Sequence, residues 1–335
     1  MKLRAGIVGL GSQWEQRYKP ALRALADRFE VRGICEQVAH RAAKAAAEFG
    51  AVPVDGYRAL AARDDVDVIL YLADQWCGPM PILAACDHGK AVYSAISLPI
   101  DVPEAEQLRA KIDASGIAFM AELPRRHAPA TVRLKELIAT RLGTPRMLFC
   151  HRRVPLGRRS APSLPRDRAT EARDLTELVD WCRYVAGAEP TSVVAVRHAE
   201  TPGGLDDYQM MSLDFTQEGR PGDGPIAQVS CGYYMPEQWE EAVGFRPPPA
   251  LQVVCTNGIA FVDLPSSLVW FDSFGRHQES LDSDRPVDEH MLIQFHRKVT
   301  SLVRAVSGLD DTLRAMKIVA AASASQSEGR RIALG

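Results

Sequence analysis

Two glycines near the start of the chain occupy a position where a phosphate group can approach the backbone. Gly9-Leu10-Gly11 directly follows an apolar run that is typical of a buried strand. Glycines at such a strand end let the chain turn tightly and let a pyrophosphate lie against a helix N-terminus. Glu36 ends the second such run, where an acid can accept hydrogen bonds from ribose hydroxyls. Because a carboxylate there repels a 2′-phosphate, the pattern predicts an NAD site and makes NADP the less favoured cofactor.

The glycine motif is incomplete, because the third glycine of a G-x-G-x-x-G pattern would fall at position 14, which is Trp14. A glycine-rich turn without a ligand is therefore the alternative. The preceding strand, Glu36 and the alternation of strands and helices that follows favour the cofactor site. Trp76 comes directly after a later strand, where its ring could stack in the cleft. The expected cofactor contacts are Gly9, Gly11, Ser12, Gln13, Trp14, Glu36, Ala73, Gln75 and Trp76.

Residues 1–122 alternate between short apolar runs and helical stretches. Residues 66–72 form an apolar run with β-branched members, as expected of a strand buried on both faces. Residues 38–49 form an alanine-rich helix that Gly50 ends. Strands that alternate with helices of this kind indicate βαβ units and a parallel sheet. The sequence therefore predicts an α/β fold whose residues 1–122 are an N-terminal Rossmann dinucleotide-binding domain.

The second part of the chain, residues 123–335, has a different order of elements. Helices are expected over residues 130–142 and 175–185, after which strands follow one another as far as residue 271. Asn257-Gly258 indicates a hairpin between two of these strands, since this pair accepts positive φ at little cost. Two helices over residues 289–306 and 310–327 close the chain. We expect a C-terminal α+β domain with an open, mostly antiparallel sheet, which includes the terminal helices 289–327.

Composition excludes several classes of protein. The 335 residues suggest two domains, and a net charge of −2 excludes a strongly basic protein that coats nucleic acid. The best apolar run, residues 66–73, is interrupted by Asp67 and is far shorter than the ~18 residues of a membrane span. Seven scattered cysteines form no CxxC pair, so neither a disulfide framework nor a zinc site is expected. We expect a cytoplasmic protein with no metal, no nucleic-acid partner and no membrane association.

The sequence resembles the glucose–fructose oxidoreductase, inositol dehydrogenase and MocA-like family of oxidoreductases over most of its length. The resemblance implies a Rossmann domain followed by an open sheet that carries the substrate face and dimerises. It implies NAD-dependent hydride transfer on a sugar, polyol or sugar acid, in a homodimer or homotetramer. The residues that carry it are Gly6-Ile7-Val8-Gly9-Leu10-Gly11, Cys35-Glu36, Asp67-Val68-Ile69-Leu70, Ala85-Cys86-Asp87-His88-Gly89-Lys90-Ala91-Val92, Arg126-His127-Ala128-Pro129, Glu177-Leu178-Val179-Asp180 and Ser327-Glu328-Gly329-Arg330.

The chain departs from this family where the family handles the substrate's proton. Ala95-Ile96-Ser97 replaces the usual Glu-Lys-Pro triplet, and Ile96 can neither donate a hydrogen bond nor move a proton. Glu177 replaces the usual histidine three residues before Asp180. Gln75 and Gly78 replace an asparagine-histidine pattern. A positioned base contributes typically ~10²–10⁴-fold to such a reaction, so a substitute is required for turnover.

Glu177 is the first candidate for that substitute, because a carboxylate in a partly desolvated cleft can act near neutral pH. Asp174 and Asp180 lie three residues to either side of it on the same helix. The alternative is an i,i+4 ion pair of Arg173 with Glu177 on a solvated helix start. Tyr93 and His127 are weaker candidates, for which core packing and a structural role are the alternatives. The expected catalytic residues are Glu177, Asp180, Tyr93 and His127.

Residues 152–173 contain seven arginines, whose planar forks suit carboxylate or phosphate oxygens. By the layout of the family this loop lies beside the substrate. We therefore hypothesise an anionic carbohydrate-like ligand, such as a uronic acid or a phosphorylated sugar; a solvated loop or a subunit contact is the alternative. The expected substrate-binding residues are Arg126, Arg153, Arg173 and Asp174.

Two further functions remain open at this point. A regulatory or binding protein that keeps the nucleotide site without turnover is favoured by the loss of both the lysine and the histidine. An enzyme that uses tightly held NAD for transient oxidation during elimination or glycoside cleavage would employ Glu177 as acid and base.

Overall fold

A computed structural model describes residues 1–72, 77–95, 100–155, 168–199, 207–217, 222–235, 241, 247–281, 285–301 and 309–335. The chain divides into two compact units, each with its own core. The first unit comprises Met1–Pro124 and Asp284–Leu313, and the second comprises Arg125–Ser283 and Arg314–Gly335. Each unit is described by itself.

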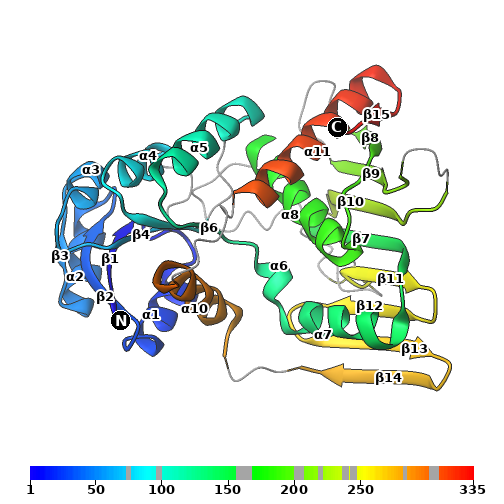
Figure 1. The fold of residues 1–335 in the computed structure, drawn as a ribbon, viewed down its shortest axis with the longest axis horizontal. Coiled ribbons are helices and arrows are strands. Elements are labelled where there is room, and N and C mark those ends of the chain that lie inside the picture. The colour runs from blue at the N-terminus through cyan, green and yellow to red at the C-terminus, as the bar shows by residue number, and fades with distance from the viewer. Residues whose placement is uncertain are drawn as a thin grey trace. The chain divides into compact units, whose positions relative to one another are not determined.

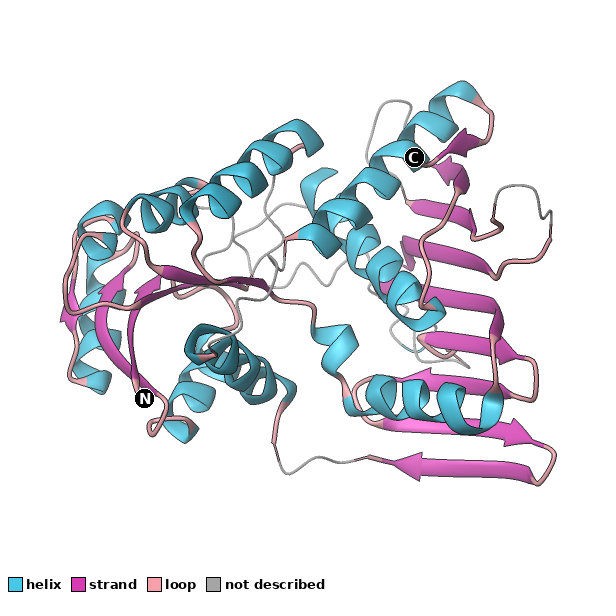
Figure 2. Ribbon diagram, in the orientation of Figure 1, coloured by secondary structure: helices cyan, strands magenta, loops and turns pink. Residues whose placement is uncertain are grey.

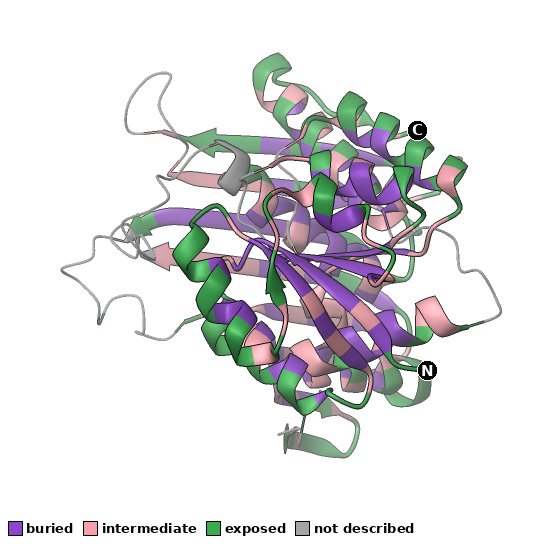
Figure 3. Ribbon diagram, turned by 90° about the vertical axis from the view of Figure 1, so that its left-hand side faces the viewer, coloured by how far each residue is buried: buried purple, intermediate pink, exposed green. Residues whose placement is uncertain are grey.

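The first unit is built on a six-stranded sheet in which every described strand pair is parallel. The strand order β3-β2-β1-β4-β5-β6 is that of a doubly wound dinucleotide-binding fold, which confirms the expected Rossmann domain. The central strands are buried on both faces, which explains their continuous apolar sequences (Figure 3). The strands are β1 (Leu3–Val8), β2 (Phe29–Cys35), β3 (Val52–Pro53), β4 (Val68–Tyr71), β5 (Ala91–Ser94) and β6 (Phe119–Ala121).

Helices cover both faces of this sheet (Figure 1). The best-defined helix start is that of α5, where Asp101 and Glu104 form a capping box that satisfies two backbone donors. Both α2 and α5 end at a glycine in the left-handed region, Gly50 and Gly116. The helices of this unit are η1 (Trp14–Tyr18), α1 (Lys19–Ala24), α2 (Ala39–Phe49), α3 (Tyr57–Ala61), α4 (Met80–Asp87), α5 (Val102–Ser115) and α10 (Val287–Thr300).

Helix α10 belongs to the first unit although it comes almost at the end of the chain. Its Met291, Leu292 and Phe295 are fully buried in the same core cluster as Leu3 of β1. The sequence analysis assigned residues 289–306 to the second domain, because chain order gives no sign that a late helix returns to the first sheet. The apolar stripe of α10 explains the return, since it covers a sheet face that would otherwise be exposed.

The second unit is built on a nine-stranded sheet of order β14-β13-β12-β11-β7-β10-β9-β8-β15. Among the described strands of this sheet, only β7 and β10 pair in parallel, so the predicted open, mostly antiparallel sheet is confirmed. Asn257-Gly258 lies in the hairpin that joins β11 to β12, as predicted. The strands are β7 (Pro145–Pro155), β8 (Ser192–His198), β9 (Tyr208–Asp214), β10 (Ile226–Met235), β11 (Leu251–Cys255), β12 (Ile259–Asp263), β13 (Ser267–Asp272), β14 (Gly275–Ser280) and β15 (Ile332–Ala333).

The helices of the second unit lie along one face of this sheet (Figure 2). Trp181 of α8 is completely buried there and donates its indole N–H to Thr131 Oγ1 at 3.0 Å. No described helix covers the opposite face of the sheet. The helices are α6 (Pro124–His127), α7 (Pro129–Leu137), η2 (Ile138–Leu142), α8 (Arg168–Ala186) and α11 (Asp310–Glu328).

No helix in the described part of the chain is both long and apolar enough to cross a bilayer.

Candidate functional site

The turn after β1 has the geometry that a diphosphate requires. Gly9 and Gly11 have φ values of 72° and 57°, in the left-handed region that glycine tolerates best. The Gly9 N–H donates to Cys35 O at 2.8 Å, which holds the turn against the end of β2. Ser12 and Gln13 are exposed on the turn, and η1 follows immediately. The turn thus presents an open backbone segment at the carboxyl edge of the parallel sheet, where doubly wound folds bind their ligands.

Glu36 lies directly beside this turn. Its carboxylate accepts a hydrogen bond from the Leu10 N–H at 2.7 Å, and only 8% of its side chain is exposed. Arg41 Nη1 of α2 lies 3.6 Å from the other carboxylate oxygen. The structure therefore brings Gly9, Gly11 and Glu36 together, and this donor and acceptor set fits the diphosphate and ribose of a dinucleotide.

Trp14 fills the core at the position where the motif expects a third glycine. Its side chain is 3% exposed, and its ring packs against Phe49 of α2 at a centroid distance of 5.8 Å. The indole thus holds η1 against α2 and has no face open to a ligand in this conformation. Ala73, Gln75, Trp76 and Ile96 lie outside the described residues.

A buried charge cluster near the same edge of the sheet was not found from the sequence. Arg17 of η1 donates its Nε–H to Asp288 Oδ1 of α10 at 2.8 Å and its Nη2 group to both Asp288 and Glu122. Glu122, the residue after β6, also accepts the Tyr18 hydroxyl at 2.5 Å. Burial raises the pKa of Glu122, and the charge of Arg17 opposes this shift. We call Arg17, Tyr18, Glu122 and Asp288 the buried charge cluster.

Tyr93 of β5 points toward the buried charge cluster rather than toward solvent. The residue is completely buried, and its hydroxyl has no hydrogen-bond partner among the described residues. Burial raises its pKa well above 10.0, and the charge of Glu122 adds to this effect. The geometry therefore favours the alternative of core packing for Tyr93 over a role in proton transfer.

Two of the four acids on α8, Asp174 and Asp180, are engaged by other side chains. Asp180 accepts hydrogen bonds from Arg126 at 2.5 and 2.7 Å and from Arg183 at 3.3 Å. Asp174 accepts the Tyr233 hydroxyl and lies 2.9 Å from Arg152 Nη1. Both carboxylates are almost completely buried, so these contacts are the ion pairs and hydrogen bonds that burial requires.

Among the acids of α8 whose side chains are described, Glu177 is the one whose carboxylate remains available to accept a proton. Its carboxylate lies 3.6 Å from Arg125 Nε and 3.8 Å from Arg152 Nη1, too far for hydrogen bonds. Its side chain is 27% exposed, and it accepts no hydrogen bond from the described residues. The alternative, an ion pair with Arg173, is not found among the described contacts; Arg125 of α6 and Arg152 of β7 lie near the carboxylate instead.

The remaining predicted site residues lie on the second unit with Asp180 and α8. Arg126 is bound to Asp180 and stacks over the Tyr184 ring at 5.0 Å, which ties α6 to α8. His127 ends α6, and Arg173 is partly exposed on α8. Arg126 is therefore paired with Asp180, whereas Arg153 lines the pocket described next.

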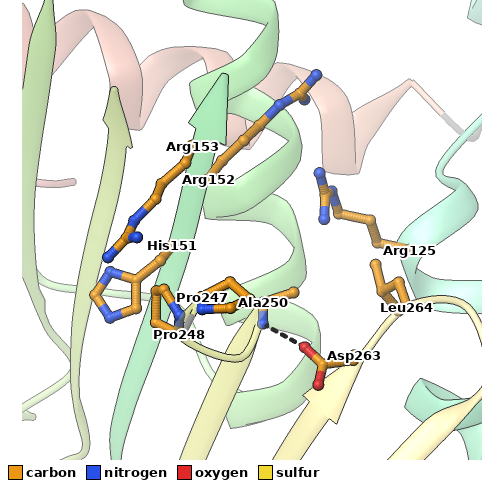
Figure 4. Close-up of a pocket in the computed structure, with 9 residues that line it drawn as sticks. All are labelled: Arg125, His151, Arg152, Arg153, Pro247, Pro248, Ala250, Asp263 and Leu264. Carbon is orange, nitrogen blue, oxygen red and sulfur yellow. Dashed lines mark hydrogen bonds between the residues drawn. The ribbon is translucent and has the colours of Figure 1, made fainter. Parts of the chain in front are cut away.

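A pocket of about 330 Å³ opens beside the carboxyl end of β7. Figure 4 shows Arg153 and His151 extending to one side of the strand and Arg152 to the other. Arg153 has no carboxylate partner in the described part of the chain. Burial lowers the pKa of His151 below 6.5, and Arg153 adds to this shift, so the imidazole is neutral at pH 7. The lining residues are Arg125, His151, Arg152, Arg153, Pro247, Pro248, Ala250, Asp263 and Leu264.

Among the described residues, no group of three or more His, Cys, Asp and Glu side chains is placed to hold a metal ion.

Sequence reasoning had one usable signal for the buried charge cluster. Glu122 follows the last strand of the parallel sheet, and polar residues at such carboxyl ends point toward a site. Its partners Arg17 and Asp288 lie 105 residues before it and 166 residues after it, so no local spacing connects them.

Comparison with known proteins agrees with this geometry. Residues 3–122 match the family model of the GFO_IDH_MocA oxidoreductases, described as an NAD-binding Rossmann fold. A dTDP-3,4-didehydro-2,6-dideoxy-alpha-D-glucose 3-reductase of Actinomadura kijaniata is 33% identical over 132 residues, 38% of either chain. Inositol 2-dehydrogenase 3 of Saccharopolyspora erythraea is 28% identical over 246 residues, 70% of this chain and 68% of its own. The matched segment thus spans little more than a third of the length of the Actinomadura kijaniata reductase.

Solved structures share the fold over the whole chain. The aldose-aldose oxidoreductase of Caulobacter crescentus, complexed with glycerol, gives a TM-score of 0.82 at 17% identity and covers 100% of both chains. An oxidoreductase of Agrobacterium radiobacter in complex with NAD+, L-tartaric acid and magnesium gives 0.78 at 15% identity, over 99% of this chain and 98% of its own. Residues 3–122 are thus similar to the NAD-binding Rossmann domain of the GFO_IDH_MocA oxidoreductases, and the whole chain shares its fold with solved oxidoreductases.

Proposed function

We propose that this chain is an NAD-dependent oxidoreductase that acts on a sugar, polyol or sugar acid. The observation that carries the proposal is the turn of Gly9 and Gly11 with Glu36 beside it, in a domain that matches an oxidoreductase family model. The named relatives act on a deoxysugar and on inositol, which supports a polyhydroxylated substrate. A bound nicotinamide supplies an acceptor or donor of hydride at the carbon that carries the hydroxyl.

Glu36 supports NAD over NADP. Its carboxylate is held beside the turn by the Leu10 N–H, so it cannot move away from a 2′-phosphate without losing that hydrogen bond. Arg41 lies near enough to attract such a phosphate if the carboxylate charge were removed.

Glu36→Gln tests this selectivity. The amide oxygen keeps an acceptor for Leu10 N–H but removes the negative charge, so affinity for NADP should rise relative to NAD. We expect the ratio of the two dissociation constants, measured by calorimetry, to move by about tenfold, or about 1.4 kcal/mol. Glu30→Gln, an exposed acid on the same strand, is the control and should leave the ratio unchanged. An unchanged ratio in Glu36→Gln contradicts the assignment.

Glu177 is the residue we propose to accept the hydroxyl proton. Hydride transfer from an alcohol leaves a carbonyl only if the hydroxyl proton departs as well, and a carboxylate can take it. Of the three acids on α8 whose side chains the structure describes, Glu177 alone has a carboxylate that no described residue engages by a hydrogen bond. Arg125 and Arg152 both lie at ion-pair distance from its Oε2 and form no hydrogen bond with it.

Glu177→Gln should abolish turnover while dinucleotide binding persists. Removing a positioned base should lower kcat by about 10²–10⁴-fold, read as formation of reduced nicotinamide with a panel of sugars, polyols and sugar acids. Glu136→Gln, an exposed acid on α7 that pairs with Arg133, is the matched control. Rates in Glu177→Gln that equal those of the unaltered protein would remove Glu177 from the mechanism.

A second candidate function is nucleotide binding without turnover. It is favoured by the ion pairs that occupy Asp174 and Asp180, which leave Glu177 as the single available acid among the described side chains of α8. Binding of NAD with no oxidation or reduction across the same substrate panel would support this candidate over the first.

An acidic group on the substrate is supported by the pocket at the end of β7. Arg153 brings a positive charge that no described carboxylate neutralises, and the neutral His151 beside it offers hydrogen bonds without repelling a cation or an anion. The pocket volume lies at the lower end of the ~300–1,000 Å³ typical of small-molecule sites, which suits a single sugar ring. A structural relative binds L-tartaric acid, a hydroxylated diacid.

Arg153→Met should therefore weaken binding of sugar acids selectively. The variant keeps most of the side-chain volume but removes the guanidinium fork, so Kd for a uronic acid should rise about tenfold or more, whereas Kd for the neutral sugar should hardly change. Arg146→Met, an exposed arginine at the other end of β7, serves as control. Equal affinities for acidic and neutral sugars in the unaltered protein would refute the role of charge.

Self-association through the uncovered face of the nine-stranded sheet is the assembly we propose. Large apolar side chains on this face are exposed, among them Met147, Ile226 and Val196 at 44%, 50% and 52%. Apolar patches of this kind mark protein–protein interfaces more often than free surface. The face is built from one sheet, so two copies can meet through the same surface about a two-fold axis.

Val196→Glu should disrupt this assembly. A charge in the centre of an apolar interface is left without solvent or a partner, so sedimentation should shift from a dimer or tetramer toward the monomer. Val132→Glu introduces the same charge at a similarly exposed valine on α7 and should leave the assembly intact. A monomeric unaltered protein would overturn the proposal.

A further inference from the structure

The buried charge cluster joins three segments that are far apart in the chain. Arg17 comes from η1, Glu122 from the end of β6 and Asp288 from the first turn of α10. A single guanidinium bridges the two carboxylates, and Tyr18 supplies a further hydrogen bond to Glu122. The side chain of Glu122 is 3% exposed, so its charge depends on these partners.

The cluster lies immediately after the proposed dinucleotide turn. Five residues separate Gly11 from Arg17, and the last of them belong to η1, a π-helix. Single π-helical turns are rare and occur mostly within α-helices, often at functional sites. Here η1 runs directly into α1, so the contacts of both helices set its position. The turn is anchored on its first side by the Cys35 carbonyl and Glu36, and on its second side by Trp14 packing and by Arg17.

Of the anchors on the second side, the ion pairs of Arg17 lie nearest to the turn and fix two directions at once, whereas the pair of Lys19 with Glu48 lies further along the chain in α1. Packing of Trp14 against Phe49 is non-directional and tolerates sliding of η1 along α2. The planar fork of Arg17 holds two carboxylates in fixed directions. We therefore infer that Arg17, through Glu122 and Asp288, is a positioning residue for the dinucleotide turn, so that attachment of α10 contributes to cofactor affinity. This inference rests on the proposed binding of a dinucleotide at that turn.

Another ion pair of the first unit provides the comparison that separates positioning from stability. Arg4 at the start of β1 pairs with both oxygens of Asp67 just before β4, at 2.7 and 3.0 Å. This pair also uses an arginine fork and bridges two segments, but it lies at the amino edge of the sheet, away from the glycine turn. Replacing the guanidinium of Arg4 therefore measures how much the loss of an arginine fork lowers the stability of the protein, without an effect on the turn.

The experiment measures NAD affinity and thermal stability in Arg17→Lys and in Arg4→Lys. A lysine keeps the charge but lacks the planar fork that fixes the directions of its hydrogen bonds, so the turn in Arg17→Lys loses a directional anchor. We expect its dissociation constant for NAD to rise about tenfold, the equivalent of one hydrogen bond to a charged group, while Arg4→Lys stays within about twofold of the unaltered protein. The loss of Tm should be similar in the two variants.

Glu122→Gln keeps the shape of the cluster and is the substitute if Arg17→Lys does not fold. It should weaken NAD binding in the same direction. In the unaltered protein, NAD should also slow amide exchange at residues 287–290 as well as at the turn, because the two are coupled through Arg17.

The outcomes separate this inference from the proposed function. An unaltered protein that binds neither NAD nor NADP defeats both. If the unaltered protein binds NAD, an unchanged affinity in Arg17→Lys together with exchange protection confined to the turn defeats the inference alone and makes the cluster purely structural.

Discussion

The hydrogen bond from the Leu10 N–H to the Glu36 carboxylate is the contact on which the proposed chemistry depends. It joins the ends of two neighbouring parallel strands and closes the turn in which Gly9 and Gly11 adopt left-handed conformations. The carboxylate is thereby both a structural acceptor and the acid that a ribose would meet. A substitution at Glu36 therefore acts on the conformation of the turn and on cofactor selectivity together, unless it keeps an acceptor oxygen.

The fold was predictable because its signals are local. Apolar runs on a doubly buried sheet, glycines at helix ends and Asn257-Gly258 each depend on a few neighbouring residues, and each indicated the element that the structure contains. The return of α10 to the first unit and the buried charge cluster have no such signal, since their partners lie more than a hundred residues away. Trp14 and Tyr93 show the same limit, because aromatic residues beside a site pattern are equally typical of a core.

Three acids of α8 have equivalent positions in the sequence pattern but different contacts in the folded protein. Asp174, Glu177 and Asp180 recur at three-residue intervals and are indistinguishable by sequence. In the structure, Arg126 and Arg183 occupy Asp180, while Tyr233 and Arg152 occupy Asp174. The difference is set by residues of α6, β7 and β10, which sequence spacing cannot place. Glu177 remains available because its two arginines approach only to ion-pair distance.

The pairing of arginines with carboxylates near the end of β7 supports the proposal of an anionic ligand. Lysine and arginine total 40 and the acids total 42, so the chain has enough carboxylates to pair its cations. Three arginines near the end of β7 are paired in this way with carboxylates of α8: Arg125, Arg126 and Arg152. Arg153 differs, since it lines the pocket with no described carboxylate beside it and lowers the pKa of the neighbouring His151. A cation left unpaired in a concave site gains most when a ligand brings the missing charge, because the ion pair then forms in a partly desolvated pocket.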